Sequence, residues 1–143
     1  MTTHTVERPA AAAFGAKAWA RIGLTAAAAS IAAVLAVQAL ATAVWPDIAL
    51  FNPLDSLGRS AVFTLVPAIG ATAVFAGLAR RSARPESKFI TISAVVLLIS
   101  VLPDYALPVP HKTLLASTVT AFLHVVAGVV TVALLIAGYR RHR

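Results

Sequence analysis

The sequence contains no cysteine, and this absence excludes disulfide bonds, thiol redox centres and cysteine-ligated metals. Charge is also scarce: only 12% of the 143 residues are charged, and acidic residues are the rarer kind, at five. Hydrophobic residues make up 59% of the chain, and its mean hydropathy is +0.87. A soluble domain of this size needs far more polar surface to cover its core, so the composition predicts a membrane protein.

The basic residues fall mainly into three clusters, which four apolar stretches separate. The clusters are Arg8, Lys17 and Arg21, then Arg80, Arg81, Arg84 and Lys88, and finally Arg140, Arg141 and Arg143. Because positive flanks resist translocation, each cluster marks the cytoplasmic side of a membrane. We therefore expect four transmembrane helices in a bacterial plasma membrane, with the N- and C-termini both cytoplasmic.

The net charge of +7 does not indicate a nucleic-acid partner. The basic residues lie at predicted helix ends, and no basic stripe with interleaved aromatic residues occurs. Contact with the lipid bilayer, and in particular with anionic inner-leaflet lipids, accounts for these charges better.

The apolar pattern predicts an all-α fold, a four-helix transmembrane bundle that forms one domain over residues 14–143. Residues 1–13 are expected to be a disordered cytoplasmic tail. The expected helices span 22–45, 56–79, 85–102 and 113–138, and residues 14–21 are expected to lie along the inner interface. A cleaved signal peptide is the alternative for the first helix, but its apolar run exceeds the about 7–15 residues of a signal core. A re-entrant segment is the alternative for the short third helix.

Aromatic and small residues predict how these helices meet lipid and one another. Trp19, Trp45, Tyr105 and Tyr139 fall at predicted helix ends, as an aromatic belt requires. Small residues form one face on the first helix and one on the second, and such faces let membrane helices approach closely. These faces are Ala28, Ala32 and Ala36, and Gly70, Ala73 and Gly77. They are expected to pack within the bundle or to mediate a homodimer.

Two segments of the chain resemble each other and indicate an internal repeat. Residues 44–53 and 101–110 share a Pro-Asp pair, Pro46-Asp47 and Pro103-Asp104, followed by a further proline. We interpret them as parts of two tandem helical hairpins, related by a pseudo-two-fold axis along the membrane normal. The alternative is that Pro-Asp ends a helix twice by convergence.

The fourth helix carries the sharpest polar pattern. Polar or small residues recur there every three or four positions, which places them on one helix face. They are Thr113, Ser117, Thr120, His124, Gly128 and Thr131. Ionisable residues inside a membrane are costly and are functional candidates. His124 is therefore either a ligand contact, proton relay or haem ligand, or a neutral histidine that locks the bundle through a hydroxyl such as that of Thr72 or Thr91.

Asp47 and Asp104 form a second candidate set, at the outer rim of the predicted bundle. With Arg59, His111 or Lys112 as counter-charges, they would line a vestibule for a polar head group or a cation. Alternatively, each aspartate only satisfies backbone N–H groups in a proline turn. Gln38 on the first helix is expected to lie near Ser117 and Thr120.

Several signatures of chemistry are missing from the sequence. No set of nucleophile, base and orienting residue can be assembled, and no metal-binding spacing such as His-x-x-x-His occurs. A bis-histidine haem site would need a second histidine at the depth of His124, and His111 is expected at the outer surface. We therefore expect no cofactor, no metal and no enzymatic activity.

The segments at 101–105 (Val-Leu-Pro-Asp-Tyr) and 123–127 (Leu-His-Val-Val-Ala) resemble an uncharacterised family of unknown function. Its members are small four-helix membrane proteins from actinobacteria. The resemblance covers about residues 15–140 and implies four helices and a plasma-membrane location, without any activity. It makes Asp104 and His124 the first positions to test.

The sequence thus favours a non-enzymatic membrane protein that binds a lipid-like or small polar ligand, or a partner membrane protein. The candidate site lies in the outer half of the bundle. Its residues are His124, Thr120, Ser117, Gln38, Asp104 and Asp47. A small oligomeric transporter or channel and a cofactor-binding redox subunit are the alternatives.

Overall fold

The structure, a computed structural model, describes residues 14–142, and the tail expected at 1–13 lies outside them. This part of the chain forms four long α-helices and two short 3-10 helices, and it contains no strand. The elements are α1 (Ala16–Val44), η1 (Pro46–Leu50), η2 (Asn52–Leu54), α2 (Leu57–Arg81), α3 (Pro85–Ala106) and α4 (Leu114–His142). Each α-helix is long and apolar enough to cross a membrane. The predicted all-α four-helix bundle is therefore confirmed, and the protein is membrane-embedded.

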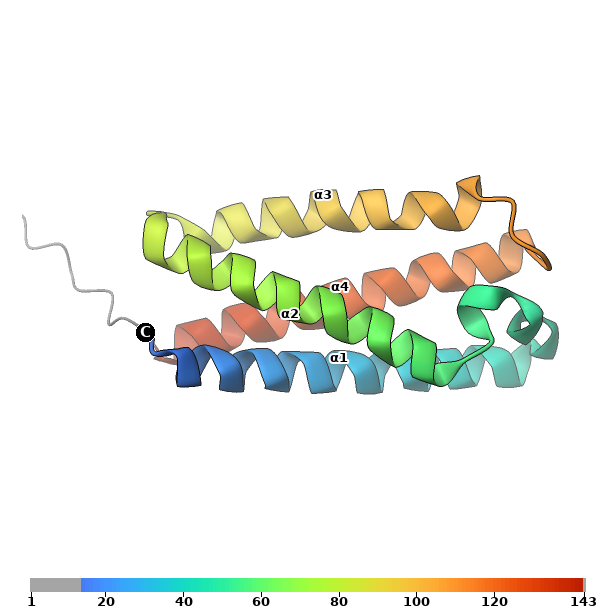
Figure 1. The fold of residues 1–143 in the computed structure, drawn as a ribbon, viewed down its shortest axis with the longest axis horizontal. Helices are drawn as coiled ribbons and strands as arrows, with labels where there is room; N and C mark the ends of the chain where they lie inside the picture. Colours follow the sequence, from blue (N-terminus) through green and yellow to red (C-terminus); the bar gives the residue numbers. More distant parts are fainter. Residues whose placement is uncertain (1–13, 143) are drawn as a thin grey trace, which may run out of the picture.

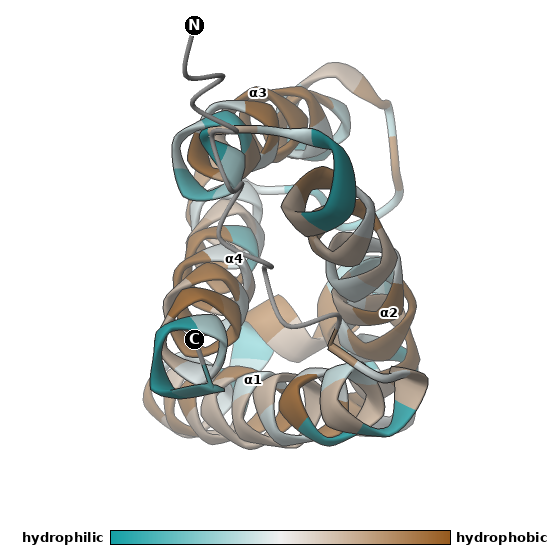
Figure 2. Cartoon of the chain, turned by 90° about the vertical axis from the view of Figure 1, so that its left-hand side faces the viewer, coloured by the Kyte–Doolittle hydropathy of each residue, from teal (hydrophilic) through white to brown (hydrophobic). Residues whose placement is uncertain are grey.

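The four α-helices run alternately in opposite directions and close into a ring (Figures 1 and 2). Each helix packs against the next one in the chain, and α4 packs back against α1. We call the end with the α2–α3 connection the basic end, and the opposite end, which holds η1 and η2, the loop end. The described basic residues at the basic end are Lys17, Arg21, Arg80, Arg81, Arg84, Lys88, Arg140 and Arg141.

The first helix is longer than the sequence predicted. It begins at Ala16 rather than at Ile22, with Gly15 as its N-cap residue. No helix-breaking residue stands between Ala16 and Ile22, so the helix continues towards the N-terminus. Residues 14–21 are therefore not a separate interfacial segment.

The third helix also extends beyond its predicted end, from Leu102 to Ala106. Pro103 has no N–H to donate, which led to the prediction of a helix end there. The backbone continues nonetheless, and the N–H of Leu107 donates to the carbonyl of Pro103 at 3.0 Å. Asp104 consequently lies on a helix and not in an outer connection.

The connection between α1 and α2 folds into the loop end of the bundle. The side chains of Ile48, Phe51 and Leu54 are buried there and pack against α1 and α4. Gln38 of α1, itself buried, donates from Nε2 to the carbonyl of Leu54 at 3.1 Å. At the start of α2, the Ser56 hydroxyl accepts a hydrogen bond from the backbone N–H of Arg59, which makes Ser56 the N-cap residue of this helix. Residues 46–56 therefore act as a plug between the helix ends.

An aromatic cluster fills the basic end of the bundle, with one ring from each α-helix. Its members are Trp19, Phe75, Phe89 and Tyr139, all of them buried. The rings of Phe75 and Phe89 stack with their centroids 4.5 Å apart. Trp19 and Tyr139 thus belong to the core and not to the predicted aromatic belt. Trp45 and Tyr105 at the loop end are exposed and can serve there.

The small residues that let helices approach are different from those predicted. A Cβ added to Gly23 would lie 2.7 Å from Thr72 of α2, and one added to Gly138 would lie 2.7 Å from Ile22 of α1. The two expected small faces point outward instead: Ala28 and Gly70 are exposed, and nothing lies within 4 Å of a Cβ added to Gly70. Neither face packs within the described chain.

The close approach at Gly138 yields a first prediction. Gly138→Leu should lower the free energy of unfolding by about 2 kcal/mol, because the new side chain would collide with Ile22 in a packed interface. The matched control Gly70→Leu should change it by less than about 0.5 kcal/mol, as expected for an open surface position. Thermal unfolding of both variants in detergent measures the difference. Equal losses of stability in Gly138→Leu and Gly70→Leu would contradict the close α1–α4 contact at Gly138.

Candidate functional site

Two contacts between an acidic and a basic side chain join α3 to α4, one towards each end of the interface. Glu86 pairs with Arg140 at the basic end, and Asp104 pairs with His124 towards the loop end. Between them, the two methyl carbons of Leu97 lie 3.6 Å from a Cβ added to Gly128. The only buried side chains of α3 are Phe89 and Asp104. Asp104 is therefore one of the two buried anchors that hold α3 on the bundle.

Asp104 and His124 differ in their exposure. The side chain of Asp104 is 9% exposed and that of His124 is 38% exposed. Asp104 Oδ2 lies 3.3 Å from His124 Nδ1, and no group in the described chain makes a hydrogen bond to this oxygen. The backbone carbonyl of Asp104 accepts a hydrogen bond from the buried Ser117 hydroxyl at 2.7 Å. A buried acid thus faces a partly exposed histidine across the helix interface.

The surroundings of the imidazole fix which nitrogen carries the proton. His124 Nδ1 lies 3.0 Å from the carbonyl oxygen of Thr120 and 3.3 Å from Asp104 Oδ2. Both neighbours are acceptors, so Nδ1 must be the donor in the neutral ring. The other nitrogen, Nε2, then has a free lone pair, and it can accept a hydrogen bond or a proton.

The depth of this pair follows from the helix geometry. Asp104 and His124 lie about 25 Å from the Glu86–Arg140 pair along α3 and α4, at a rise of about 1.5 Å per residue. The hydrocarbon core of a bilayer is about 30 Å thick. If the basic end marks one boundary, the Asp104–His124 pair lies about one helical turn inside the other boundary.

The structure brings together three of the six predicted site residues in one cluster, because Ser117 and His124 of α4 both contact Asp104 of α3. Thr120 contributes only its backbone carbonyl, 3.0 Å from His124 Nδ1, and its hydroxyl donates to the carbonyl of Ala116 in the same helix. Gln38 instead holds the carbonyl of Leu54, and its Oε1 has no hydrogen-bond partner between residues 14 and 142. It therefore holds the plug in place and does not belong to the cluster.

Asp47 also lies outside the cluster. It lies exposed in η1, after the end of α1, whereas Asp104 is buried within α3. The two acids are therefore not equivalent in the structure, and they do not line one rim. A duplication of the two hairpins stays a prediction from the sequence.

The expected counter-charges of the acids have other partners. Arg59 pairs with Asp55 at 2.7 Å, and Lys112 donates to the carbonyls of Tyr105 and Leu107, both at 2.9 Å. His111 lies in the connection between α3 and α4 with a left-handed backbone (φ 58°). None of the three forms an ion pair with Asp104.

The polar and small residues predicted to share one face of α4 contact two different neighbouring helices. Ser117, His124 and Gly128 face α3. Thr131 instead shares a buried hydrogen bond of 2.7 Å with Ser30 of α1. The hydroxyls expected to bind His124 bind their own helices instead, as the bond from Thr72 to Ala68 O shows. Sequence reasoning missed the partner, Asp104, because it placed that residue in a loop.

Comparisons with known proteins identify a family but no activity. The family model described as "Family of unknown function (DUF6069)" matches residues 14–141. This confirms the resemblance that the segments at 101–105 and 123–127 indicated. No curated protein and no solved structure matches the chain. Between residues 14 and 142, no three His, Asp or Glu side chains are grouped closely enough to hold a metal ion.

Proposed function

We propose that this chain, which belongs to the family of unknown function DUF6069, is a non-enzymatic membrane protein that binds a lipid-like head group at Asp104 and His124. One observation carries the proposal: the buried Asp104 Oδ2 has no hydrogen bond from the described chain and faces a partly exposed imidazole at 3.3 Å. A buried carboxylate without a full set of partners costs stability unless another interaction compensates for it. Such a group is a candidate for ligand contact.

The chemistry of the pair selects a ligand that donates hydrogen bonds. His124 Nε2 is an acceptor in the neutral ring, and the Asp104 carboxylate supplies negative charge behind it. A primary ammonium group matches both, because it carries a positive charge and N–H donors. A quaternary ammonium group carries the same charge without any N–H, so it should bind less well.

The surroundings of the pair favour a lipid-like ligand. Phe122 and Val125, which flank His124 along α4, are exposed and apolar, as is Leu102 on α3. The pair also lies about one turn inside the membrane boundary at the loop end. A head group at this level could reach the imidazole while its acyl chains lie against these side chains.

The orientation of the protein is part of the proposal. The cations of the basic end favour a cytoplasmic position, because positive flanks resist translocation. Among the described acids, only Glu86 lies at that end. The site would then open to the outer leaflet of a bacterial plasma membrane.

Native mass spectrometry of delipidated protein tests the proposed ligand. Wild-type protein should bind phosphatidylethanolamine at least about tenfold more tightly than phosphatidylcholine, because a hydrogen bond with a charged partner contributes about 1.5–3 kcal/mol. In His124→Asn the amide nitrogen can take the place of Nδ1, while Nε2 is lost, so this preference should disappear without unfolding.

The loop histidine offers a matched control. His111→Asn removes another imidazole at the loop end, and asparagine tolerates the left-handed backbone there. This variant should keep the wild-type lipid preference. Equal binding of the two lipids by wild-type protein, or an unchanged preference in His124→Asn, would contradict the proposed site.

A further inference from the structure

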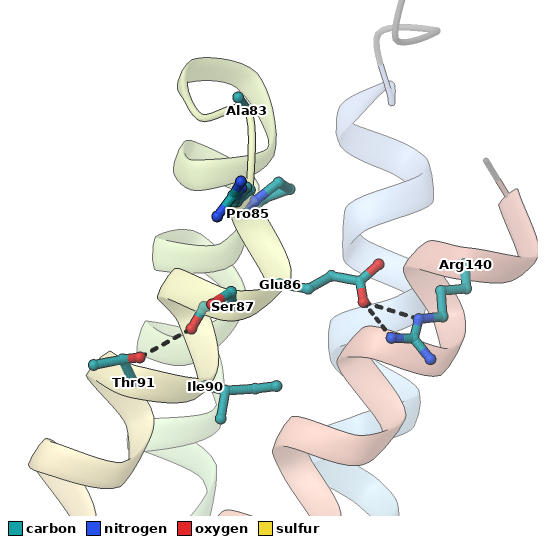
Figure 3. Close-up of a pocket in the computed structure, with 8 residues that line it drawn as sticks. Ala83, Pro85, Glu86, Ser87, Ile90, Thr91 and Arg140 are labelled. Carbon is teal, nitrogen blue, oxygen red and sulfur yellow. Dashed lines mark hydrogen bonds and ion pairs between the residues drawn. The ribbon is translucent and has the colours of Figure 1, made fainter.

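A groove opens at the basic end, between the first turns of α3 and the last turns of α4 (Figure 3). Its volume is about 530 Å³, and its lining includes Arg84, Glu86, Ser87, Ile90 and Arg140. It lies at the opposite end of α3 from Asp104. It is therefore independent of the site proposed above.

An acid within the groove orients one of its two arginines. Glu86 Oε2 accepts hydrogen bonds from Nε, at 2.9 Å, and from Nη2 of Arg140 (Figure 3). This contact uses one edge of the guanidinium group and leaves Nη1 without a part in the pair. The Arg140 side chain remains 66% exposed. Glu86 thus positions Arg140 and leaves part of its donor set available to a ligand.

The start of α3 adds further donors to the groove. Arg84 is the N-cap residue, and its side chain makes no capping hydrogen bond. The first backbone N–H groups of a helix have no partner within the helix, and they carry partial positive charge. The hydroxyl of Ser87 takes part in no hydrogen bond within residues 14–142, although its carbonyl accepts one from Thr91. This wall of the groove therefore presents donors and positive charge.

The same groove has an apolar side. Ile90 lines it and is 50% exposed, and the exposed apolar surface of α3 continues towards the loop end through Val95 and Leu98. A free inorganic anion would use only the polar wall. An amphipathic anion would use both walls.

We propose that this groove binds the phosphate of an anionic phospholipid in the leaflet at the basic end. Arg84 and the free edge of Arg140 contact the phosphate, together with the hydroxyl of Ser87, and an acyl chain lies along Ile90. Arginine is well suited to phosphate because its planar donors match the phosphate oxygens. Basic pockets between membrane helices are known to bind anionic head groups.

Substitution of one arginine inside the groove and one outside it tests this proposal. Phosphatidylglycerol is titrated into delipidated protein in a neutral detergent, and bound lipid is counted by native mass spectrometry. Wild-type protein should bind one such lipid preferentially over phosphatidylcholine. Arg84→Gln should weaken that binding at least tenfold, as expected for loss of a hydrogen bond between charged groups. Arg81→Gln, which removes the same charge from a residue outside the groove, should weaken it less than threefold.

Two results would overturn the proposal. Equal weakening by Arg84→Gln and Arg81→Gln would show that overall charge, and not the groove, attracts the lipid. Glycerol phosphate, the head group without acyl chains, should bind at least a hundredfold more weakly than the lipid. Binding of glycerol phosphate as tight as that of phosphatidylglycerol would exclude a role for the apolar wall.

Discussion

Replacing His124 by leucine is expected to lower the free energy of unfolding by about 3 kcal/mol, the cost of leaving a buried charge without its partner. The imidazole lies 3.3 Å from Asp104 Oδ2, which has no hydrogen bond from the rest of the described chain. Leucine fills a similar volume but has no N–H group to place beside the carboxylate. Unfolding in mixed micelles, titrated with a denaturing detergent, measures the loss.

Replacing the other member of the pair, Asp104, by leucine should lower the free energy of unfolding by less. In Asp104→Leu, His124 can remain neutral and keep its Nδ1 hydrogen bond to the Thr120 carbonyl. The double variant Asp104→Leu, His124→Leu should lie within about 1 kcal/mol of wild type, because replacing both members of a buried pair by apolar groups is often neutral. The four proteins form a double-mutant cycle, which isolates the interaction between the two side chains.

The variant His124→Asn shows whether the loss of stability comes from the missing N–H donor or from the changed shape of the side chain. His124→Asn places an amide donor near the position of Nδ1, so it should cost less than about 1 kcal/mol, the net contribution of an ordinary hydrogen bond. Strictly additive losses in the cycle would mean that Asp104 and His124 do not interact. A loss in His124→Asn as large as that in His124→Leu would mean that the Nδ1 contact contributes nothing.

The membrane fold was predictable because its signals reinforce one another. Four uncharged apolar runs, each bounded by basic or proline-rich segments, leave little choice of architecture. The ends of the helices were harder to predict. At Pro103 the local rule for proline indicates a stop, but the helix continues to Ala106. That additional turn is what brings Asp104 to the level of His124.

The members of the candidate site were therefore predicted better than their pairing. Asp104 was singled out for its place beside a proline, and His124 for its place within an apolar helix. Nothing in the sequence assigned them to each other, because matching the depth of residues on two helices requires correct helix ends. An error of one turn moves a residue by about 5 Å along the bundle.

Packing between the helices was the least predictable feature. In a bilayer, lipid tails are as apolar as the side chains of a neighbouring helix, so a face of alanine residues is not forced inward. Ala28 and Gly70 accordingly point outward, while Gly23 and Gly138 form the close contacts. The packing of η1 and η2 against the helices could not be predicted from the sequence either. Asn52-Pro53 indicates a turn, but it does not show where Phe51 packs.

Truncation of the aromatic cluster should have an effect as large as that at His124. Phe75→Ala is expected to lower the free energy of unfolding by about 3 kcal/mol, at the low end for a buried phenylalanine. Phe75 is fully buried, and its ring contacts those of Trp19, Phe89 and Tyr139, so its removal affects all four helices at once. Unfolding in mixed micelles again provides the measurement.

A second phenylalanine of α2 provides the control that shows why Phe75→Ala lowers the stability. Phe63 on α2 is 71% exposed, so Phe63→Ala removes the same atoms from a surface that faces lipid. Lipid tails replace the lost contacts there, and the stability should change by less than about 0.5 kcal/mol. At Phe75 nothing replaces them, because the surrounding rings cannot close the cavity without shifting whole helices. A similar loss in both variants would mean that the substitution acts through α2 alone, and that the aromatic cluster does not hold the basic end together.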